Sequence, residues 1–321
     1  MNARDIADTA IELPIVTSFT KLGYLARRRL DGWTPLDEYD LTGKVIVLTG
    51  ATSGLGRSAA RTFASAGATL VVVGRSDDRN AAVVDELTSS TGNTNVSQVA
   101  CDMGDLDQVR ALADRVLTDH DRLDVLIHNA GALTAERHES PDGTEATIAS
   151  QVVGPFLLTT LLLDRLAESA PSRVITMSSG GMYAAGLTID HLEMSADEYD
   201  GTQQYARAKR AQVTLNEMWA QRCGDRGVWF HAMHPGWADT PGVEASLPGF
   251  RKVMGPLLRD ADQGADTLVW LAADPEPLTQ NGGFWLDRRL RSIHKLPGTK
   301  RSDTPERRDR LWTWVESHAA G

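Results

Sequence analysis

Short apolar segments alternate with helical segments along most of this chain, and that alternation limits the folds open to it. The apolar segments are rich in Val, Ile and Leu, as expected of strands with both faces covered. Seven segments are interpreted as strands, at residues 44–49, 69–73, 96–101, 123–128, 173–178, 228–233 and 283–286. Helical patterns lie between them, at residues 55–65, 81–89, 105–119, 146–166, 204–221 and 261–273. Strand followed by helix, repeated in this way, predicts an α/β fold with a doubly wound, seven-stranded parallel sheet flanked by helices.

The composition argues against several classes of protein. The chain has 33 Lys and Arg against 43 Asp and Glu, a net charge of −10, which argues against a general nucleic-acid binder. Its two cysteines, Cys101 and Cys223, form no close pair, so neither a disulfide framework nor a metal site is expected. No run of about 18 apolar residues predicts a transmembrane helix. The N-terminus lacks the pattern of a secretory signal, and we expect a cytoplasmic protein.

One domain accounts for most of the chain. Residues 41–288 contain all the predicted strands and form the expected dinucleotide-binding domain. Residues 1–40 precede it as an N-terminal extension. Residues 289–321 form a C-terminal tail that is expected to include an amphipathic helix at residues 305–317.

The N-terminal extension carries an apolar stripe beside three consecutive arginines at residues 27–29. Its members are Ile15, Val16, Phe19, Leu22 and Leu25. Such a stripe either contacts an anionic membrane surface or packs on its own domain, and we expect the packing.

A glycine-rich turn follows the first predicted strand and suits a phosphate group. Glycines allow the backbone to approach a pyrophosphate closely, and the next helix offers free N–H groups and the positive end of its dipole. The position of the turn, between the first strand and the first helix of the series, favours nucleotide binding over a plain turn. The residues expected to bind the nucleotide are Thr49, Gly50, Thr52, Ser53, Gly54, Leu55 and Gly56.

The end of the second strand bears on the choice of cofactor. A carboxylate there would bind the adenosine ribose of NAD, whereas an arginine pairs with the 2′-phosphate of NADP. This chain has Arg75 at that point, and Asp77 and Asp78 are expected to begin the next helix. We therefore expect NADP rather than NAD, the alternative being that Arg75 is only a solvated charge.

Tyr205 and Lys209 stand four residues apart near the start of a predicted helix, so they share one of its faces. A free phenol has a pKa of about 10, and a neighbouring ammonium with an oxidised nicotinamide would lower it. Tyr205 would then exchange a proton with a carbonyl or alcohol oxygen while a hydride moves to or from the nicotinamide.

The TGxxxGxG spacing of the turn and the YxxxK pair resemble the short-chain dehydrogenases/reductases. The strings HPGWADTPGV at residues 234–243 and QGADT at residues 263–267 are similar to the member 12 group of that superfamily, over about residues 20–298. The resemblance implies that Ser179 is the third catalytic residue, with Ser178 as the alternative. It also implies that Lys209 reaches the nicotinamide ribose.

The same resemblance assigns further residues. Gln151 takes the place of an asparagine that usually holds a water linking the lysine to solvent, so the proton relay is in question. Asp102 would lie against the adenine, and Thr240 would hold the nicotinamide carboxamide. His128 replaces the first asparagine of a usual NNAG string, and a structural role is expected for it. The other residues expected at the cofactor are Met103, Asn129, Ala130, Gly131, Pro235, Gly236, Trp237 and Ala238.

The leading hypothesis is an NADP-dependent oxidoreductase acting on a small-molecule carbonyl/alcohol pair. An inserted loop at residues 180–202 is expected to cover the substrate pocket, and apolar residues suggest an apolar substrate: Met182, Tyr183, Leu187, Leu192, Trp237, Val243, Leu247 and Phe250. A non-catalytic NADP-binding sensor is the alternative, and an epimerase or dehydratase lacks support in the glycine spacing. A homo-oligomer is compatible with the sequence.

Overall fold

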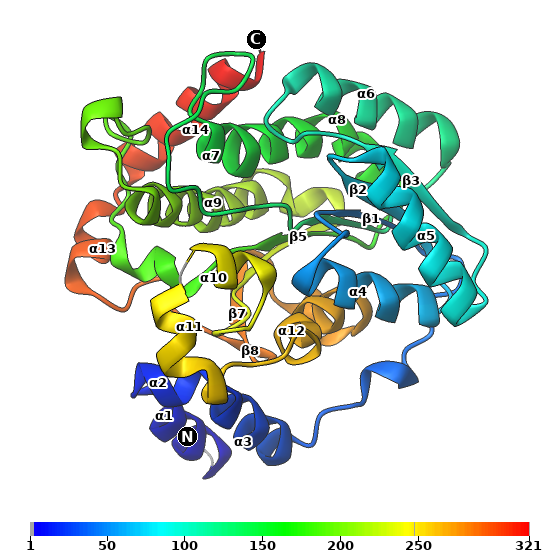
Figure 1. The fold of residues 1–321 in the computed structure, drawn as a ribbon, viewed down its shortest axis with the longest axis horizontal. Helices are drawn as coiled ribbons and strands as arrows, with labels where there is room; N and C mark the ends of the chain where they lie inside the picture. The colour runs from blue at the N-terminus through cyan, green and yellow to red at the C-terminus, as the bar shows by residue number, and fades with distance from the viewer. Residues whose placement is uncertain (1–2, 247, 321) are drawn as a thin grey trace.

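The computed structural model describes residues 3–246 and 248–320, which are built around a sheet of eight strands in the order β3-β2-β1-β4-β5-β6-β7-β8 (Figure 1). Seven of these strands run parallel: β1 (Val45–Thr49), β2 (Thr69–Gly74), β3 (Val96–Ala100), β4 (Val125–His128), β5 (Ser172–Met177), β6 (Val228–Met233) and β7 (Gly283–Leu286). The predicted α/β fold with a parallel sheet is confirmed.

The number of strands was predicted one too low. The additional strand β8 (Arg289–Leu290) pairs antiparallel with β7 through a turn in which Asp287 and Arg288 have φ of 53° and 54°. Two residues are too short for any periodic pattern, and positive φ is uncommon outside glycine. Neither the strand nor its turn therefore gave a signal in the sequence.

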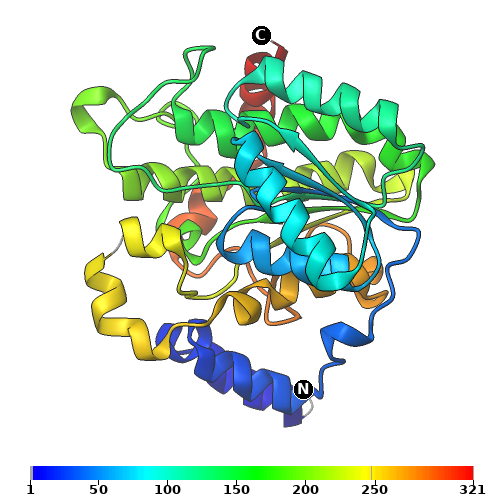
Figure 2. The ribbon, with the colours of Figure 1, turned by 45° about the vertical axis from the view of Figure 1, so that its right-hand side comes forward.

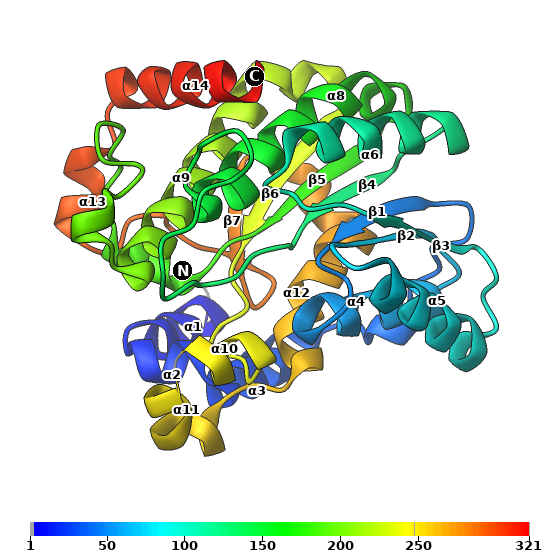
Figure 3. The same cartoon turned by 45° about the horizontal axis from the view of Figure 1, so that its top comes forward.

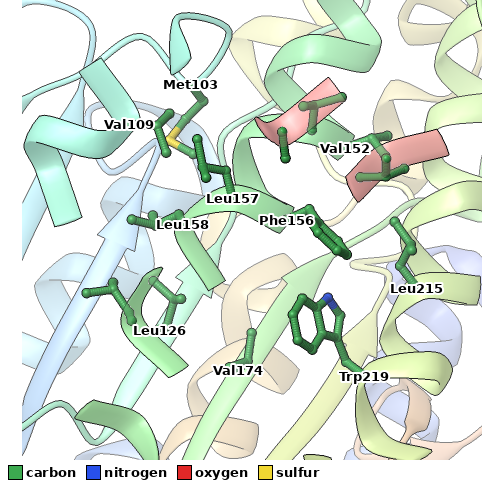
Figure 4. Close-up of a cluster of buried hydrophobic side chains, with 14 of the residues drawn as sticks. Met103, Val109, Leu126, Val152, Phe156, Leu157, Leu158, Val174, Leu215 and Trp219 are labelled. Atoms are coloured by element: carbon green, nitrogen blue, oxygen red, sulfur yellow. The ribbon is translucent and has the colours of Figure 1, made fainter. Parts of the chain in front are cut away.

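Helices cover both faces of the sheet, as Figure 3 shows. One face is covered by α4 (Gly54–Ser65), α5 (Asp77–Thr91) and α12 (Ala261–Ala273), and the other by α6 (Leu106–Asp119), α8 (Gly154–Glu168) and α9 (Gly201–Cys223). All five residues of β1 are buried, because both faces of a central parallel strand are covered. Figure 4 shows the core between the sheet and α8 and α9, where Leu126 and Val174 of the sheet pack near Leu158 and Trp219.

Among the described residues, a single helical stretch is long and apolar enough to cross a membrane. It runs from Ala146 to Glu168 with a mean hydropathy of 1.7, and 67% of its apolar window is buried inside the protein. It consists of α7 (Ala146–Ile148), a π-helical turn η2 (Ala149–Val153) and α8. This burial is that of a core helix.

The N-terminal extension forms three helices, α1 (Ala3–Glu12), α2 (Ile15–Phe19) and α3 (Lys21–Asp31), at one edge of the molecule (Figures 1 and 2). Phe19 is 3% exposed and packs on the domain, as expected for the apolar stripe. The expectation was wrong for the other four members, which are 47–52% exposed: Ile15, Val16, Leu22 and Leu25. Sequence spacing identifies one apolar face but not what covers it.

The C-terminal tail contains α13 (Pro297–Ser302) and α14 (Pro305–Ala320), so the helix predicted at 305–317 is present. The ring of Trp312 lies 4.9 Å from that of Phe156 in α8 and 4.7 Å from that of Trp219 in α9. Between β6 and α12 in the chain, two short helices, α10 (Pro241–Ser246) and α11 (Pro248–Met254), lie outside the sheet (Figure 3).

Candidate active site

The glycine-rich turn is closed so tightly that side chains are excluded from it. A Cβ on Gly56 would lie 2.1 Å from the carbonyl oxygen of Gly50, and one on Gly50 would lie 2.7 Å from the Cα of Ala130. Gly50 also has a φ of 69°, in the left-handed region that favours glycine. Helix α4 begins here, and the exposed Ser53 before it makes no side-chain cap. Its first N–H groups are therefore suited to an anion.

The ends of β1 and β4 are joined beside this turn. The Thr49 hydroxyl donates to the Ile127 carbonyl (3.1 Å) and accepts from the backbone N–H groups of Asn129 (3.0 Å) and Ala130 (3.1 Å). The Asn129 amide donates to the carbonyl oxygens of Thr49 (2.9 Å) and Gly50 (3.0 Å). These bonds fix the crevice at the point where the strand order reverses.

Arg75 lies at the end of β2 and is exposed. Within residues 3–246 and 248–320, no carboxylate forms an ion pair with it. Asp77 and Asp78 occupy the first turn of α5, whose cap is Ser76, as the sequence predicted. The Arg75 guanidinium is therefore available to bind an anionic ligand at this strand end.

Asp102 and Met103, the two residues predicted to bind the cofactor after β3, lie in different surroundings. Asp102 is half-buried, and its carboxylate accepts from the backbone N–H of Gly104 at 2.9 Å. Met103 is 4% exposed, and its side chain is part of the core in Figure 4. Its side chain therefore cannot line a cofactor site, and only its backbone remains for the predicted role.

Ser179, Tyr205 and Lys209 come together where β5 ends and α9 begins. Ser179 is the second residue after β5, and its side chain is hydrogen-bonded to Tyr205. The Lys209 ammonium lies 5.2 Å from the centre of the Tyr205 ring and donates to the Met177 carbonyl oxygen at 2.9 Å. Ser178 is instead buried, with its hydroxyl donating to the Lys209 carbonyl oxygen. The structure thus favours Ser179 over Ser178 as the third member.

Burial shifts the pKa values of Tyr205 and Lys209 in opposite directions. It raises the pKa of Tyr205 to about 12, although the hydrogen bond from Ser179 opposes the shift. It lowers the pKa of Lys209 to about 7. We expected the Lys209 ammonium to lower the pKa of Tyr205. In the protein without a cofactor, burial has the larger effect and raises that pKa instead.

Gln151 adjoins this group from the π-helical turn η2. A Cβ on Gly131 would lie 2.9 Å from its Oε1 and 3.4 Å from the Lys209 ammonium, so the three residues meet. The Gln151 amide nitrogen donates to the Ala132 carbonyl oxygen at 2.7 Å, whereas its Oε1 is buried without a partner among the described residues. A π-helical turn inside an α-helix is frequent at functional sites.

His128 has the structural role expected of it. It is buried, its Nε2 lies 2.8 Å from the Thr159 hydroxyl, and burial lowers its pKa to about 3.

The loop after β6 reaches the glycine-rich turn. A Cβ on Gly54 would lie 3.5 Å from Thr240, and one on Gly264 would lie 2.5 Å from Leu55 and 3.1 Å from Ala238. Thr240 therefore lies next to the start of α4, as its predicted contact with a cofactor requires.

The predicted wall of the substrate pocket is only partly present. Trp237 and Phe250 are half-buried, with ring centres 5.1 Å apart. Leu247 and the side chain of Val243 lie outside the described residues. The remaining four are buried at 0–7% exposure, which corrects their assignment as lining residues: Met182, Tyr183, Leu187 and Leu192. The loop at 180–202 folds back onto α9, where Arg210 donates to the carbonyl oxygens of Ala185 and Met182.

A family model described as short chain dehydrogenase matches residues 44–248. This chain belongs to the short-chain dehydrogenase family. It is accordingly an oxidoreductase with the Rossmann-type fold described above.

Relatives of this short-chain dehydrogenase extend the comparison. "Dehydrogenase/reductase SDR family member 12" of Homo sapiens is 37% identical over 303 residues, which are 94% of each chain, and the predicted similarity to that group is confirmed. Retinol dehydrogenase 12 of Homo sapiens is 31% identical over 310 residues, covering 94% of this chain and 96% of its own. The solved structure of L-sorbose reductase from Gluconobacter frateurii, complexed with NADPH and L-sorbose, has a TM-score of 0.63 at 20% identity. It covers 77% of this chain and 96% of that one, and shows the shared fold.

Sequence reasoning missed one residue of this short-chain dehydrogenase that supports the site. Arg259, 1% exposed, donates to both carboxylate oxygens of Asp287, and its backbone N–H donates to the Trp237 carbonyl oxygen at 2.8 Å. An arginine in a loop gives no sequence signal of burial. Its partner, Asp287, lies 28 positions later, in the turn after β7, whose geometry the sequence did not indicate.

Proposed function

We propose that this short-chain dehydrogenase is NADP-dependent and interconverts a carbonyl and an alcohol on an apolar small molecule. The observation that carries the proposal is the hydrogen-bonded pair of Ser179 and Tyr205 at the end of β5, with Lys209 beside the phenol ring. A sensor that only bound the nucleotide would have no use for this group. The Gln151 replacement, which is the feature in favour of a sensor, leaves all three residues in place.

The residues present fit a dinucleotide. The turn at Gly50 and Gly56 has no room for a Cβ, and the uncapped start of α4 offers N–H groups to a pyrophosphate. Arg75 would pair with a 2′-phosphate, because a planar guanidinium suits phosphate geometry. Thr240 would lie on the nicotinamide side. When bound, the cofactor supplies or accepts the hydride.

The raised pKa of Tyr205 suits the reducing direction. A phenol with a pKa of about 12 is protonated at neutral pH, so it can donate its proton to a carbonyl oxygen as that oxygen gains charge. The Ser179 hydroxyl would donate to the same oxygen and stabilise the developing charge. Lys209, with a pKa near 7, returns protons to this region readily at neutral pH.

The apolar substrate is supported by Trp237 and Phe250. Trp237 lies on the loop that follows β6 and Phe250 in α11, and their rings pack edge to face and remain half-exposed. Partly exposed aromatic rings are typical of the walls of small-molecule pockets.

Turnover with a panel of apolar aldehydes and ketones tests the proposal. NADPH oxidation is followed with the native chain and Tyr205→Phe, and NADH is run in parallel. We expect turnover with NADPH, a loss of about 10²–10⁴-fold in Tyr205→Phe, and NADPH binding retained by that variant. Tyr199→Phe is the control, because Tyr199 hydrogen-bonds Thr134 and Glu145 instead of the catalytic group. NADPH binding without turnover of any carbonyl would support the sensor instead.

Peripheral contact with an anionic membrane is a separate part of the proposal. The exposed apolar residues of α2 and α3 lie in the same segment as Lys21, Arg28 and Arg29, for which the described residues provide no ion pair. Apolar side chains beside free cations are typical of interfacial helices. Sedimentation with vesicles of neutral lipid, and of neutral plus anionic lipid, checks this. Binding that requires anionic lipid and is lost in Leu22→Glu supports the contact, and its absence with both kinds of vesicle contradicts it.

A further inference from the structure

Phe19, from the N-terminal extension, lies directly against the segment that carries the catalytic serine. A Cβ on Gly180 would lie 2.6 Å from the Cε2 of Phe19 and 3.3 Å from its Cδ2. Gly180 is the residue after Ser179, and it does not have the positive φ that would itself call for glycine. The space for a side chain at position 180 is therefore taken by the Phe19 ring.

The same residue contacts the loop that reaches the glycine-rich turn. The carbonyl oxygen of Phe19 accepts from the Trp237 backbone N–H at 2.7 Å. Its ring lies edge to face with that of Trp237, with centres 5.7 Å apart, and 4.6 Å from the ring of His234. Phe19 thus bridges the end of β5 and the loop after β6.

Two buried arginines hold this part of the extension in place. Arg259 donates to the carbonyl oxygens of Phe19 (3.1 Å) and Ser18 (3.0 Å), and Arg27 donates to that of Ser18 (3.0 Å). Both arginines also pair with Asp287, Arg27 at 2.7 Å and Arg259 at 2.5 Å. All three side chains are at most 1% exposed, so solvent does not weaken the network.

Gly236 completes the fit on the side of the loop. It has a φ of 73°, and a Cβ there would lie 2.4 Å from Arg259 and 2.6 Å from the Phe19 carbonyl oxygen. The loop after β6 therefore approaches the Phe19 backbone at Gly236, and the segment after Ser179 approaches the Phe19 ring at Gly180.

We infer that Phe19 is a positioning residue of the active site: the N-terminal extension sets the relative placement of Ser179 and the loop 234–240. The inference rests on the proposed function, since it concerns the nicotinamide and substrate side of that same site. The adenosine side is formed by the glycine-rich turn and Arg75, which Phe19 does not touch in the structure. Loss of the ring should therefore disturb one half of cofactor binding and spare the other.

Binding of two probes to the full chain tests this separation. NADPH engages both halves of the site, whereas adenosine 2′,5′-bisphosphate engages the adenosine side alone. In Phe19→Ala we expect the Kd for NADPH to rise several-fold and carbonyl turnover to fall about 10²-fold, with the bisphosphate Kd unchanged. Leu13→Ala is the matched control, because Leu13 belongs to the same extension and is 78% exposed. If Phe19 only stabilised the fold, Phe19→Ala would raise the Kd for both probes.

A double-mutant cycle isolates the contact between Phe19 and Gly180. Gly180→Ala places a methyl group against the ring and should weaken NADPH binding and turnover, whereas the same change in a Phe19→Leu background should cost much less. Phe19→Leu also keeps an apolar side chain in the core, so the cycle remains measurable if Phe19→Ala does not fold.

The outcomes separate the two proposals. A native chain that does not bind NADPH overturns the proposed function, and this inference with it. A native chain that binds and turns over, with Phe19→Ala or Phe19→Leu behaving like Leu13→Ala and with additive effects in the cycle, overturns the inference alone.

Discussion

The Lys209 ammonium and the Tyr205 ring lie 5.2 Å apart, in a place where burial opposes the charged form of both groups. The ammonium has one hydrogen-bond acceptor, the Met177 carbonyl oxygen, and no carboxylate among the described residues pairs with it. A buried cation with so little compensation costs folding free energy, so the catalytic use that we propose for this site comes with a stability cost.

The first prediction is that Lys209→Met stabilises the protein while abolishing turnover. The pKa of Lys209 falls from 10.5 to about 7 on folding, so the unfolded chain binds the proton more tightly and the native state is penalised as pH falls from 10.5 toward 7. Removal of the amine should raise the free energy of unfolding at pH 7 by about 3 kcal/mol, after allowance for the lost hydrogen bond. Denaturant unfolding at pH 7 and 9 measures the gain, which should be smaller at pH 9. Lys252→Met, at the surface, should change nothing, and a destabilised Lys209→Met would contradict the prediction.

The second prediction concerns Arg75 and the choice of cofactor. Arg75→Ala should raise the Kd for NADPH by about 10–100-fold, because a hydrogen-bonded charge pair with phosphate contributes about 1.5–3 kcal/mol. The Kd for NADH should change little. Fluorescence titration with each nucleotide measures both constants. Arg115→Ala serves as the control, since Arg115 pairs with Asp119 on α6. Equal losses for both nucleotides would show that Arg75 does not read the 2′-phosphate.

The third prediction is that Gly56→Ala eliminates nucleotide binding. The new Cβ would meet the Gly50 carbonyl oxygen at 2.1 Å, so the turn must open and the N–H groups of α4 lose their alignment. Gly298→Ala is matched to it, because no atom lies within 4 Å of a Cβ at that position. Calorimetric titration with NADPH compares the two variants. If Gly56→Ala kept its affinity for NADPH, binding of the cofactor's phosphates would not depend on this turn.

The fourth prediction is a loss of stability in mild acid. Burial lowers the pKa of His128 and His231 to about 3, and it also holds the pKa of His234 well below its usual value. These rings therefore stay neutral in the native state, while the unfolded chain takes up protons below about pH 6.5. Their stabilising contribution is present above pH 6.5 and declines as pH falls, by up to about 1.4 kcal/mol per pH unit for each histidine. The free energy of unfolding should therefore decrease by about 4 kcal/mol per pH unit between pH 6 and 5.

His128→Asn tests that account by removing one of the three rings. The slope of unfolding free energy against pH should fall by about a third, whereas His191→Asn, at an exposed position, should leave it unchanged. A slope that is the same in both variants would mean that other groups cause the acid sensitivity.

Much of the fold could be predicted because it depends on patterns that are local in the chain. The apolar segments were placed close to the seven parallel strands, and the four-residue spacing of Tyr205 and Lys209 correctly predicted a shared helix face. The Asp77–Asp78 pair was correctly placed at a helix start, because acids in a first turn have a local physical cause.

What could not be predicted depends on packing between distant segments. The apolar residues of the loop at 180–202 look the same in sequence whether they face a ligand or the core, and four residues assigned to the pocket wall are core residues. The π-helical turn at Gln151 is a local insertion without a periodic signal. The direction of the Tyr205 pKa shift depends on burial, which only the tertiary structure reveals.

The shared carboxylate of Asp287 has a consequence for the order of folding. Arg27 leaves the ribosome early, yet its buried partner follows 260 positions later, after every parallel strand has been made. Arg27 can pair with Asp8 and Glu12 within the extension, but its bond to Asp287 can form only after the parallel strands have been synthesised. Full anchoring of the extension therefore requires the chain as far as the turn after β7.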